Sequence, residues 1–116
     1  MTIMEPYEEM DRYQITVGLN DSESKVQERD TETFESVIKK VCKGYHVAFS
    51  LSKCLGGYYH EDQTYVSENS LILTLIGAEE YMVEEISKDI CAFFHQECVM
   101  VTHDKVFCRY VSESLE

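Results

Sequence analysis

Apolar and polar residues alternate along several short stretches of the chain. The clearest case is residues 11–19, where Tyr13, Ile15, Val17 and Leu19 fall on one face. A period of two is typical of a strand that is buried on one side. Weaker versions of this signal predict a long hairpin and a final strand with an extension. The strands predicted in this way are residues 11–19, 45–52, 64–66 with 71–76, 98–102 and 106–111.

Two longer stretches repeat their apolar residues at intervals of three and four, which is typical of amphipathic helices. The first begins near Glu32, with Asp30 or Thr31 as the capping residue, and ends at Gly44. The second covers residues 77–95. The apolar stripes are Phe34, Val37, Ile38 and Val41 in the first helix, and Met82, Val83, Ile86, Ile90, Phe93 and Phe94 in the second.

Two interruptions are expected within the predicted strands. Gly56 and Gly57 predict a bulge or bend in the first arm of the hairpin. Residues 103–105 are all polar and predict a turn before the last strand.

The order strand, helix, strand, strand, helix, strand predicts an α+β fold. The expected fold is a ferredoxin-like βαββαβ sandwich, with four or five antiparallel strands and two helices on one face. We expect a single domain over residues 11–112, between an acidic N-terminal arm (residues 1–10) and a frayed tail (residues 113–116). The outer sheet face has mixed polarity, which predicts that a second copy or a partner covers it. Its residues are Gln14, Thr16, Ala48, Ser50, Ile72, Thr74, Ile76, Cys98 and Met100.

The chain is strongly acidic, with 22 Asp and Glu against 10 Lys and Arg and a net charge of −12. This charge argues against a protein that binds nucleic acid or anionic membranes. It fits either a solvated surface or a carboxylate array that binds a basic groove of a partner. Tyrosines beside the acids would add buried contacts. The candidate partner-binding residues are Asp21, Glu23, Glu28, Tyr58, Tyr59, Glu61, Asp62, Tyr65, Glu68, Glu80, Glu84, Glu85 and Asp89.

Catalytic signals are weak, and the common phosphate-binding, hydrolase and metalloprotease motifs are missing from the sequence. His60, Glu61 and Asp62 form the densest titratable cluster, and Cys54 with His60 would be a nucleophile and base. A polar hairpin turn explains these residues more simply, so we predict no catalytic residue and no enzyme. The five cysteines lack paired metal-ligand spacing, and we predict free thiols, no metal and no cofactor.

The N-terminus lacks the basic and apolar regions of a signal peptide. The longest apolar run falls short of the ~20 residues that a membrane helix needs. We therefore expect a cytoplasmic protein that binds neither nucleic acid nor membrane directly.

Three segments carry a resemblance to known proteins. They are YQITVGLND (residues 13–21), GGYYHEDQTYVSENSLILTL (residues 56–75) and FHQECVMV (residues 94–101). They resemble a small bacterial ferredoxin-like family of unassigned function found on Gram-positive mobile genetic elements. The pattern is also similar to that of short reading frames on plasmids and conjugative elements, among which are type II anti-CRISPR proteins that inhibit Cas9. This resemblance implies an antidefence inhibitor and transfers no functional residue.

Together, charge and resemblance predict a non-catalytic acidic binding protein. It would act as an anti-CRISPR inhibitor and nucleic-acid mimic that blocks a basic surface of Cas9 or of its guide-loaded complex. The alternative is a dimeric ferredoxin-like protein with a small-molecule or enzymatic site on the outer sheet face.

Charge reversal separates these two predictions. Changing Glu80, Glu84, Glu85 and Asp89 to Lys should abolish Cas9 inhibition, because the carboxylates would no longer match a basic surface. The same change should leave a dimeric pocket protein unaffected. The measurement is a pull-down with apo and guide-loaded Cas9 proteins at two salt concentrations, with DNA cleavage followed in parallel. Undiminished cleavage in the presence of the wild-type protein would contradict the inhibitor.

Overall fold

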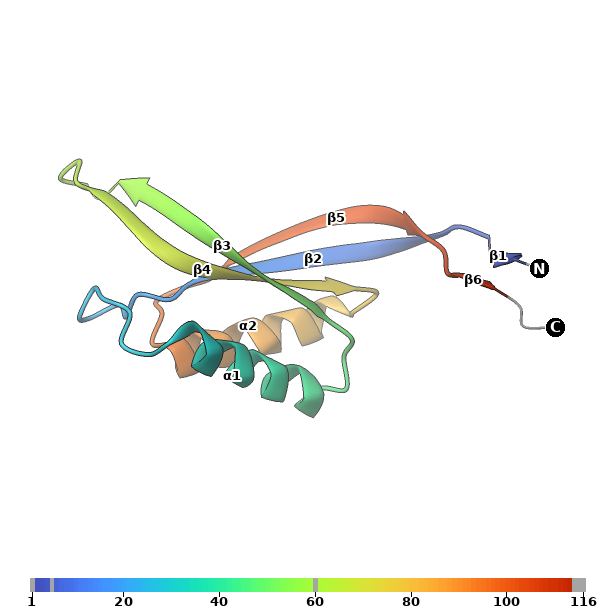
Figure 1. The fold of residues 1–116 in the computed structure, drawn as a ribbon, viewed down its shortest axis with the longest axis horizontal. Helices are drawn as coiled ribbons and strands as arrows, with labels where there is room; N and C mark the ends of the chain where they lie inside the picture. The colour runs from blue at the N-terminus through green and yellow to red at the C-terminus, as the bar shows by residue number, and fades with distance from the viewer. Residues whose placement is uncertain (1, 5, 60, 114–116) are drawn as a thin grey trace.

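A four-stranded antiparallel sheet carries two helices on one of its faces (Figure 1). The computed structural model describes residues 2–4, 6–59 and 61–113. The elements of these residues are β1 (Thr2–Met4), β2 (Glu8–Gly18), α1 (Thr31–Gly44), β3 (Ser50–Tyr59), β4 (Tyr65–Ile76), α2 (Glu80–Phe94), β5 (Met100–Cys108) and β6 (Val111–Glu113).

The strand order of the sheet is β3-β4-β2-β5, so β2 and β4 lie at its centre. All of its neighbouring strands are antiparallel. The helices connect β2 to β3 and β4 to β5 across one face. This arrangement confirms the predicted ferredoxin-like βαββαβ fold. A separate ribbon joins β1 to β6 near the two ends of the chain (Figure 1).

The core lies between the helices and the inner face of β2 and β4. The predicted alternation in β2 is confirmed, since Tyr13, Ile15 and Val17 are buried and the residues between them are half-buried. Apart from Phe93, both helical stripes face this layer. Burial of apolar area of this kind is the main favourable contribution to folding. The fully buried side chains include Ile15, Leu19, Ile38, Leu71, Leu73, Leu75, Ile86 and Ile90.

The helix ends follow local chemistry. Asp30 caps α1 by accepting hydrogen bonds from the backbone N–H and hydroxyl of Thr33, and these bonds lower the pKa of Asp30. α2 ends at His95, which adopts the left-handed conformation with φ 52° and ψ 47°. Phe94 packs on Phe34 of α1 with ring centroids 4.6 Å apart. Phe93, predicted to join the buried stripe, is instead 59% exposed, because adjacent helical residues point in different directions.

The hairpin differs from its prediction in two places, at its first residues and at the two glycines. The strand predicted at residues 45–52 begins only at Ser50, because residues 45–49 carry the chain from the helix layer to the sheet, with His46 at a φ of 55°. The bulge predicted at Gly56 and Gly57 is wrong. The β3–β4 register runs unbroken through both, from Ser50 opposite Thr74 to Tyr59 opposite Tyr65.

The turn predicted at residues 103–105 is also wrong, since these residues lie inside β5. Their polar side chains pair with those of β2 across the strands. Arg12 donates to both carboxylate oxygens of Asp104 at 2.9 and 2.6 Å, and His103 contacts Asp11 at 2.7 Å. Cross-strand pairs of opposite charge stabilise a strand that extends beyond the core.

The chain ends hold more regular structure than the sequence predicts. The expected arm of residues 1–10 contains β1 and the first residues of β2. In the predicted frayed tail, Glu113 lies in β6, and residues 114–116 lie outside the described residues.

The molecule is elongated, with principal extents of 60 × 28 × 26 Å. Its radius of gyration is 17.1 Å, against about 13 Å for an average compact domain of this length. Figure 1 shows the reason: the strands run past the helices at both ends of the sheet. We call the part of β3 and β4 from residue 55 to residue 68 the hairpin arm. No helix in the described residues is long and apolar enough to span a membrane.

Two glycines should respond oppositely to substitution by alanine. Gly77 has a φ of +82°, and an added Cβ would lie 2.6 Å from the Met10 methyl group. We expect Gly77→Ala to destabilise the protein by about 1–3 kcal/mol. Gly44 is helical and faces open space, so Gly44→Ala should stabilise it by about 0.5–1 kcal/mol. Urea unfolding followed by circular dichroism measures both, and a change of stability in the same direction would contradict this prediction.

Candidate functional site

A cleft of about 430 Å³ lies where the hairpin arm leaves the body of the protein. The loop after β2 and the segment before β5 form its other walls. Its volume is within the usual range for small-molecule sites. We call it the loop–hairpin cleft. Its lining residues are Asn20, Asp21, Ser22, Lys25, Tyr58, Val66, Glu68, Gln96, Glu97 and Cys98.

Strand alternation places the hairpin wall of this cleft on the outer sheet face. Leu71 and Leu73 of β4 are buried beneath the helices, so Glu68 and Val66 point the other way. Tyr58 lies opposite Val66 in the β3–β4 register and shares its side of the sheet. The cleft is therefore on the face that the helices do not cover.

Glu68 is half-buried and sits directly on the backbone of β2. A Cβ added to Gly18 would lie 2.5 Å from the carboxylate carbon of Glu68, so a larger residue at position 18 would displace this carboxylate. The backbone N–H of Asn20 donates to Glu68 Oε2 at 3.0 Å. The carboxylate is thus fixed against the main chain, with room in the cleft on its other side.

The loop after β2 is organised by Asp21. Its Oδ1 accepts hydrogen bonds from the backbone N–H groups of Glu23 at 2.9 Å and Ser24 at 3.2 Å. These bonds lower the pKa of Asp21, whose side chain is 13% exposed. His95 Nδ1 lies 3.3 Å from Asp21 Oδ2. The ionised Asp21 therefore holds the turn and ties it to the end of α2.

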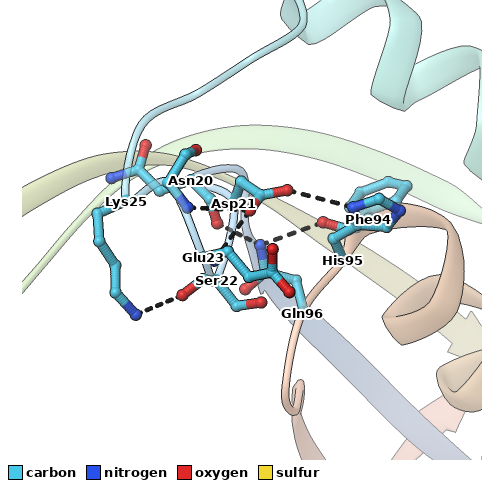
Figure 2. Close-up of polar contacts among 9 residues, drawn as sticks. Asn20, Asp21, Ser22, Glu23, Lys25, Phe94, His95 and Gln96 are labelled. Carbon is cyan, nitrogen blue, oxygen red and sulfur yellow. Dashed lines mark hydrogen bonds and ion pairs between the residues drawn. The ribbon is translucent and has the colours of Figure 1, made fainter.

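Figure 2 shows further contacts that join this loop to the end of α2. The N–H of Ser22 donates to the carbonyl of His95 at 3.1 Å. The side-chain amide of Gln96 donates to the carbonyl of Asn20. Two cleft walls that are far apart in the sequence are connected in this way.

The lining combines negative charge with one aromatic ring. Asp21, Glu68 and Glu97 supply carboxylates, while Lys25 supplies an ammonium group. The ring of Tyr58 is 42% exposed. Carboxylates together with an aromatic face suit a ligand that carries a positive charge and a flat or apolar part.

The structure brings together only part of the predicted partner-binding set. Asp21, Tyr58 and Glu68 line the cleft. Tyr59 and Tyr65 pack edge to face at 5.3 Å on the opposite side of the hairpin arm. The other predicted residues lie on the loop (Glu23, Glu28), at the hairpin tip (Glu61, Asp62) and on α2 (Glu80, Glu84, Glu85, Asp89), while His60 lies outside the described residues.

Asp89 has a structural contact that the sequence did not reveal. It accepts a hydrogen bond from the Tyr45 hydroxyl at 2.9 Å, which raises the pKa of Tyr45. A charge reversal that tests partner binding should therefore be made at Glu80, Glu84 and Glu85, which are exposed. Reversal at Asp89 would also remove the bond to Tyr45.

The sequence missed most of the other lining residues. Gln96 and Glu97 belong to the FHQECVMV segment, which carried the resemblance but no predicted role, and Cys98 was predicted only as part of the outer sheet face. Asn20 contributes through its backbone, for which a sequence gives no signal.

The cysteines do not form a cluster. All five are free thiols, and burial raises the pKa of the Cys42 thiol to about 11. Cys98, in the cleft, is exposed. Across residues 2–4, 6–59 and 61–113 no group of three or more His, Cys, Asp or Glu side chains is arranged to hold a metal ion.

No protein-family model and no curated protein matches the chain. A phage SAM lyase in complex with S-methyl-5′-thioadenosine has a similar structure, with a TM-score of 0.62 and 20% identity over 92% of this chain and 93% of that chain. The apo state of a phage SAM lyase gives a TM-score of 0.62 and 22% identity, over 91% and 92% of the chains. CutA1 from Pyrococcus horikoshii gives a TM-score of 0.48 and 18% identity, over 84% of this chain and 82% of that chain. The likeness to the lyase supports the ferredoxin-like fold over nearly the whole chain, and the anti-CRISPR resemblance stays a prediction.

The lowered pKa of Asp21 gives a pH-dependent prediction for stability. Its ionised form stabilises the folded state above the ordinary carboxyl pKa of about 3.9, and this contribution is lost as the pH falls through the lower pKa of the folded protein. We expect Asp21→Asn to unfold at a lower urea concentration than the wild type at neutral pH. The difference should shrink as the pH falls below about 4. A difference that does not change with pH would contradict this role.

Proposed function

We propose that the protein is a lyase that cleaves S-adenosylmethionine in the loop–hairpin cleft and releases S-methyl-5′-thioadenosine. The observation that carries the proposal is the Glu68 carboxylate, fixed over Gly18 in an open cleft of suitable volume. The likeness to a SAM lyase across the whole fold supports it. This function is a form of the predicted alternative, an enzymatic site on the outer sheet face.

The charge of the cleft fits this substrate. S-adenosylmethionine carries a positive sulfonium group, and the carboxylates of Asp21, Glu68 and Glu97 attract it. Tyr58 adds aromatic surface to the lining beside these carboxylates. Lys25, whose ammonium group donates one hydrogen bond to the carbonyl of Ser22, has further N–H donors for the carboxylate of the methionine part. Neutral thioethers would gain less from such a site, so the site favours substrate over the thioether product.

The reaction needs no external reactant. The bond between the sulfonium sulfur and the γ-carbon breaks, and its electron pair stays on sulfur, which becomes the neutral thioether of S-methyl-5′-thioadenosine. The substrate's own carboxylate oxygen forms the new bond to the γ-carbon and closes a lactone. Glu68 holds the sulfonium in position for this displacement. The site contributes by orienting the substrate carboxylate toward the γ-carbon.

Substitution of Glu68 tests the proposal. The wild-type protein incubated with S-adenosylmethionine should produce S-methyl-5′-thioadenosine and the lactone, both measured by mass spectrometry. Glu68→Gln should lower turnover by about a hundredfold or more, because it removes the charge that holds the sulfonium. The matched control is Glu84→Gln, since Glu84 is exposed on α2.

Two results would contradict the lyase. One is the absence of thioether product from the wild-type protein, and the other is equal turnover by the two variants. A product heavier by one water molecule would instead indicate a hydrolase.

The Cas9 inhibitor remains a second proposal. It is favoured by Glu80, Glu84 and Glu85, which are exposed together on α2 and take no part in the cleft. The predicted homodimer through the outer sheet face likewise stays a proposal, to be checked by light scattering. The inhibitor would use the surface of α2, whereas the homodimer would use the same sheet face that carries the loop–hairpin cleft.

A further inference from the structure

The carboxylate of Glu68 depends on the position of one backbone amide. Asn20 donates to it at 3.0 Å, and Asn20 lies just beyond the end of β2. The last backbone bond before it joins the N–H of Leu19 to the carbonyl of Asn69 at 2.9 Å. Beyond Leu19 the sheet no longer determines the direction of the Asn20 peptide groups.

Gln96 holds Asn20 in place of a strand neighbour. Its side-chain amide donates to the carbonyl of Asn20, and it also lies 3.5 Å from the carbonyl of Phe94 (Figure 2). The N–H of Asn20 thus contacts Glu68 and its carbonyl contacts Gln96, while the other side of that second peptide unit, the Asp21 N–H, donates to the carbonyl of Val26 at 2.9 Å.

Gln96 is itself attached to a rigid element. Its backbone N–H donates to the carbonyl of Cys91 at 3.0 Å, immediately after the left-handed residue His95 that ends α2. The bond from Ser22 to the His95 carbonyl fixes the same loop a second time. A side chain anchored in this way can transmit the position of a helix end to a site.

We propose that Gln96 is a positioning residue that keeps Glu68 in its working orientation through Asn20. The effect on turnover rests on the proposed lyase function, whereas the effect on the Asn20 amide does not. Removal of the Gln96 amide would leave the loop attached through Ser22 and Asp21. The Asn20 N–H would then no longer be directed at the Glu68 carboxylate.

The test uses three variants of the full chain. Gln96→Leu removes the amide, and Gln96→Glu keeps the side-chain length but replaces the donor with an acceptor. The control is Gln14→Leu, which also removes a side-chain amide bond, to Thr74 at 3.3 Å, on the same sheet face but outside the cleft lining. Thermal unfolding of all three shows whether any effect reflects a general loss of stability.

The first readout is the amide resonance of Asn20 in ¹⁵N–¹H spectra. A charge-assisted hydrogen bond moves this proton downfield, and Glu68→Gln, which removes the charge, should move it back upfield. We expect the downfield position in the wild type and in Gln14→Leu, and its loss in both Gln96 variants.

The second readout is turnover of S-adenosylmethionine. We expect kcat to fall about tenfold to a hundredfold in the Gln96 variants, with KM unchanged, because orientation and not binding is lost. An Asn20 resonance that keeps its wild-type position in a Gln96 variant would overturn the inference, and so would equal turnover by Gln96→Leu and Gln14→Leu when the wild type is active. A wild-type protein without turnover would overturn the lyase alone, and the Asn20 resonance would still decide the role of Gln96.

Discussion

The packing of two helices onto β2 and β4 is the contact on which the rest of the structure depends. α2 has 15 residues and β4 has 12. At their usual rises these correspond to about 22 Å of helix and about 40 Å of strand. The helices therefore cover only the middle of the sheet. The uncovered ends extend past them and give the molecule its length (Figure 1).

The two ends are stabilised by different interactions. At the β2–β5 end, charged side chains pair across the strands, as Arg12 does with Asp104. At the other end the hairpin arm leaves the body, and the loop after β2 returns beside it. Their divergence opens the loop–hairpin cleft, so the candidate site is a geometric consequence of strands that are longer than their helices.

The acidity of the chain serves several separate purposes. Asp30 caps a helix, Asp21 orders a loop, and Asp104 pairs across strands. Glu68 is different, because its carboxylate rests against Gly18 and faces a cleft. A net charge of −12 is thus the sum of local roles together with a solvated surface on α2. For the proposed lyase, the position of the Glu68 carboxylate matters more than the net charge of the chain.

The sequence by itself determined the order of the strands and helices of the main sheet, most of the buried positions and both ends of α1. These depend on side-chain periodicity and on capping residues that act on their near neighbours, as Asp30 does. The tertiary structure alone decided that Gly56 and Gly57 continue a strand and that residues 103–105 do so too, because the partner strands supply their bonds. It also brought Gln96 to Asn20 and Asn20 to Glu68. These contacts join residues dozens of positions apart and use backbone groups that every residue carries, so no local pattern records them.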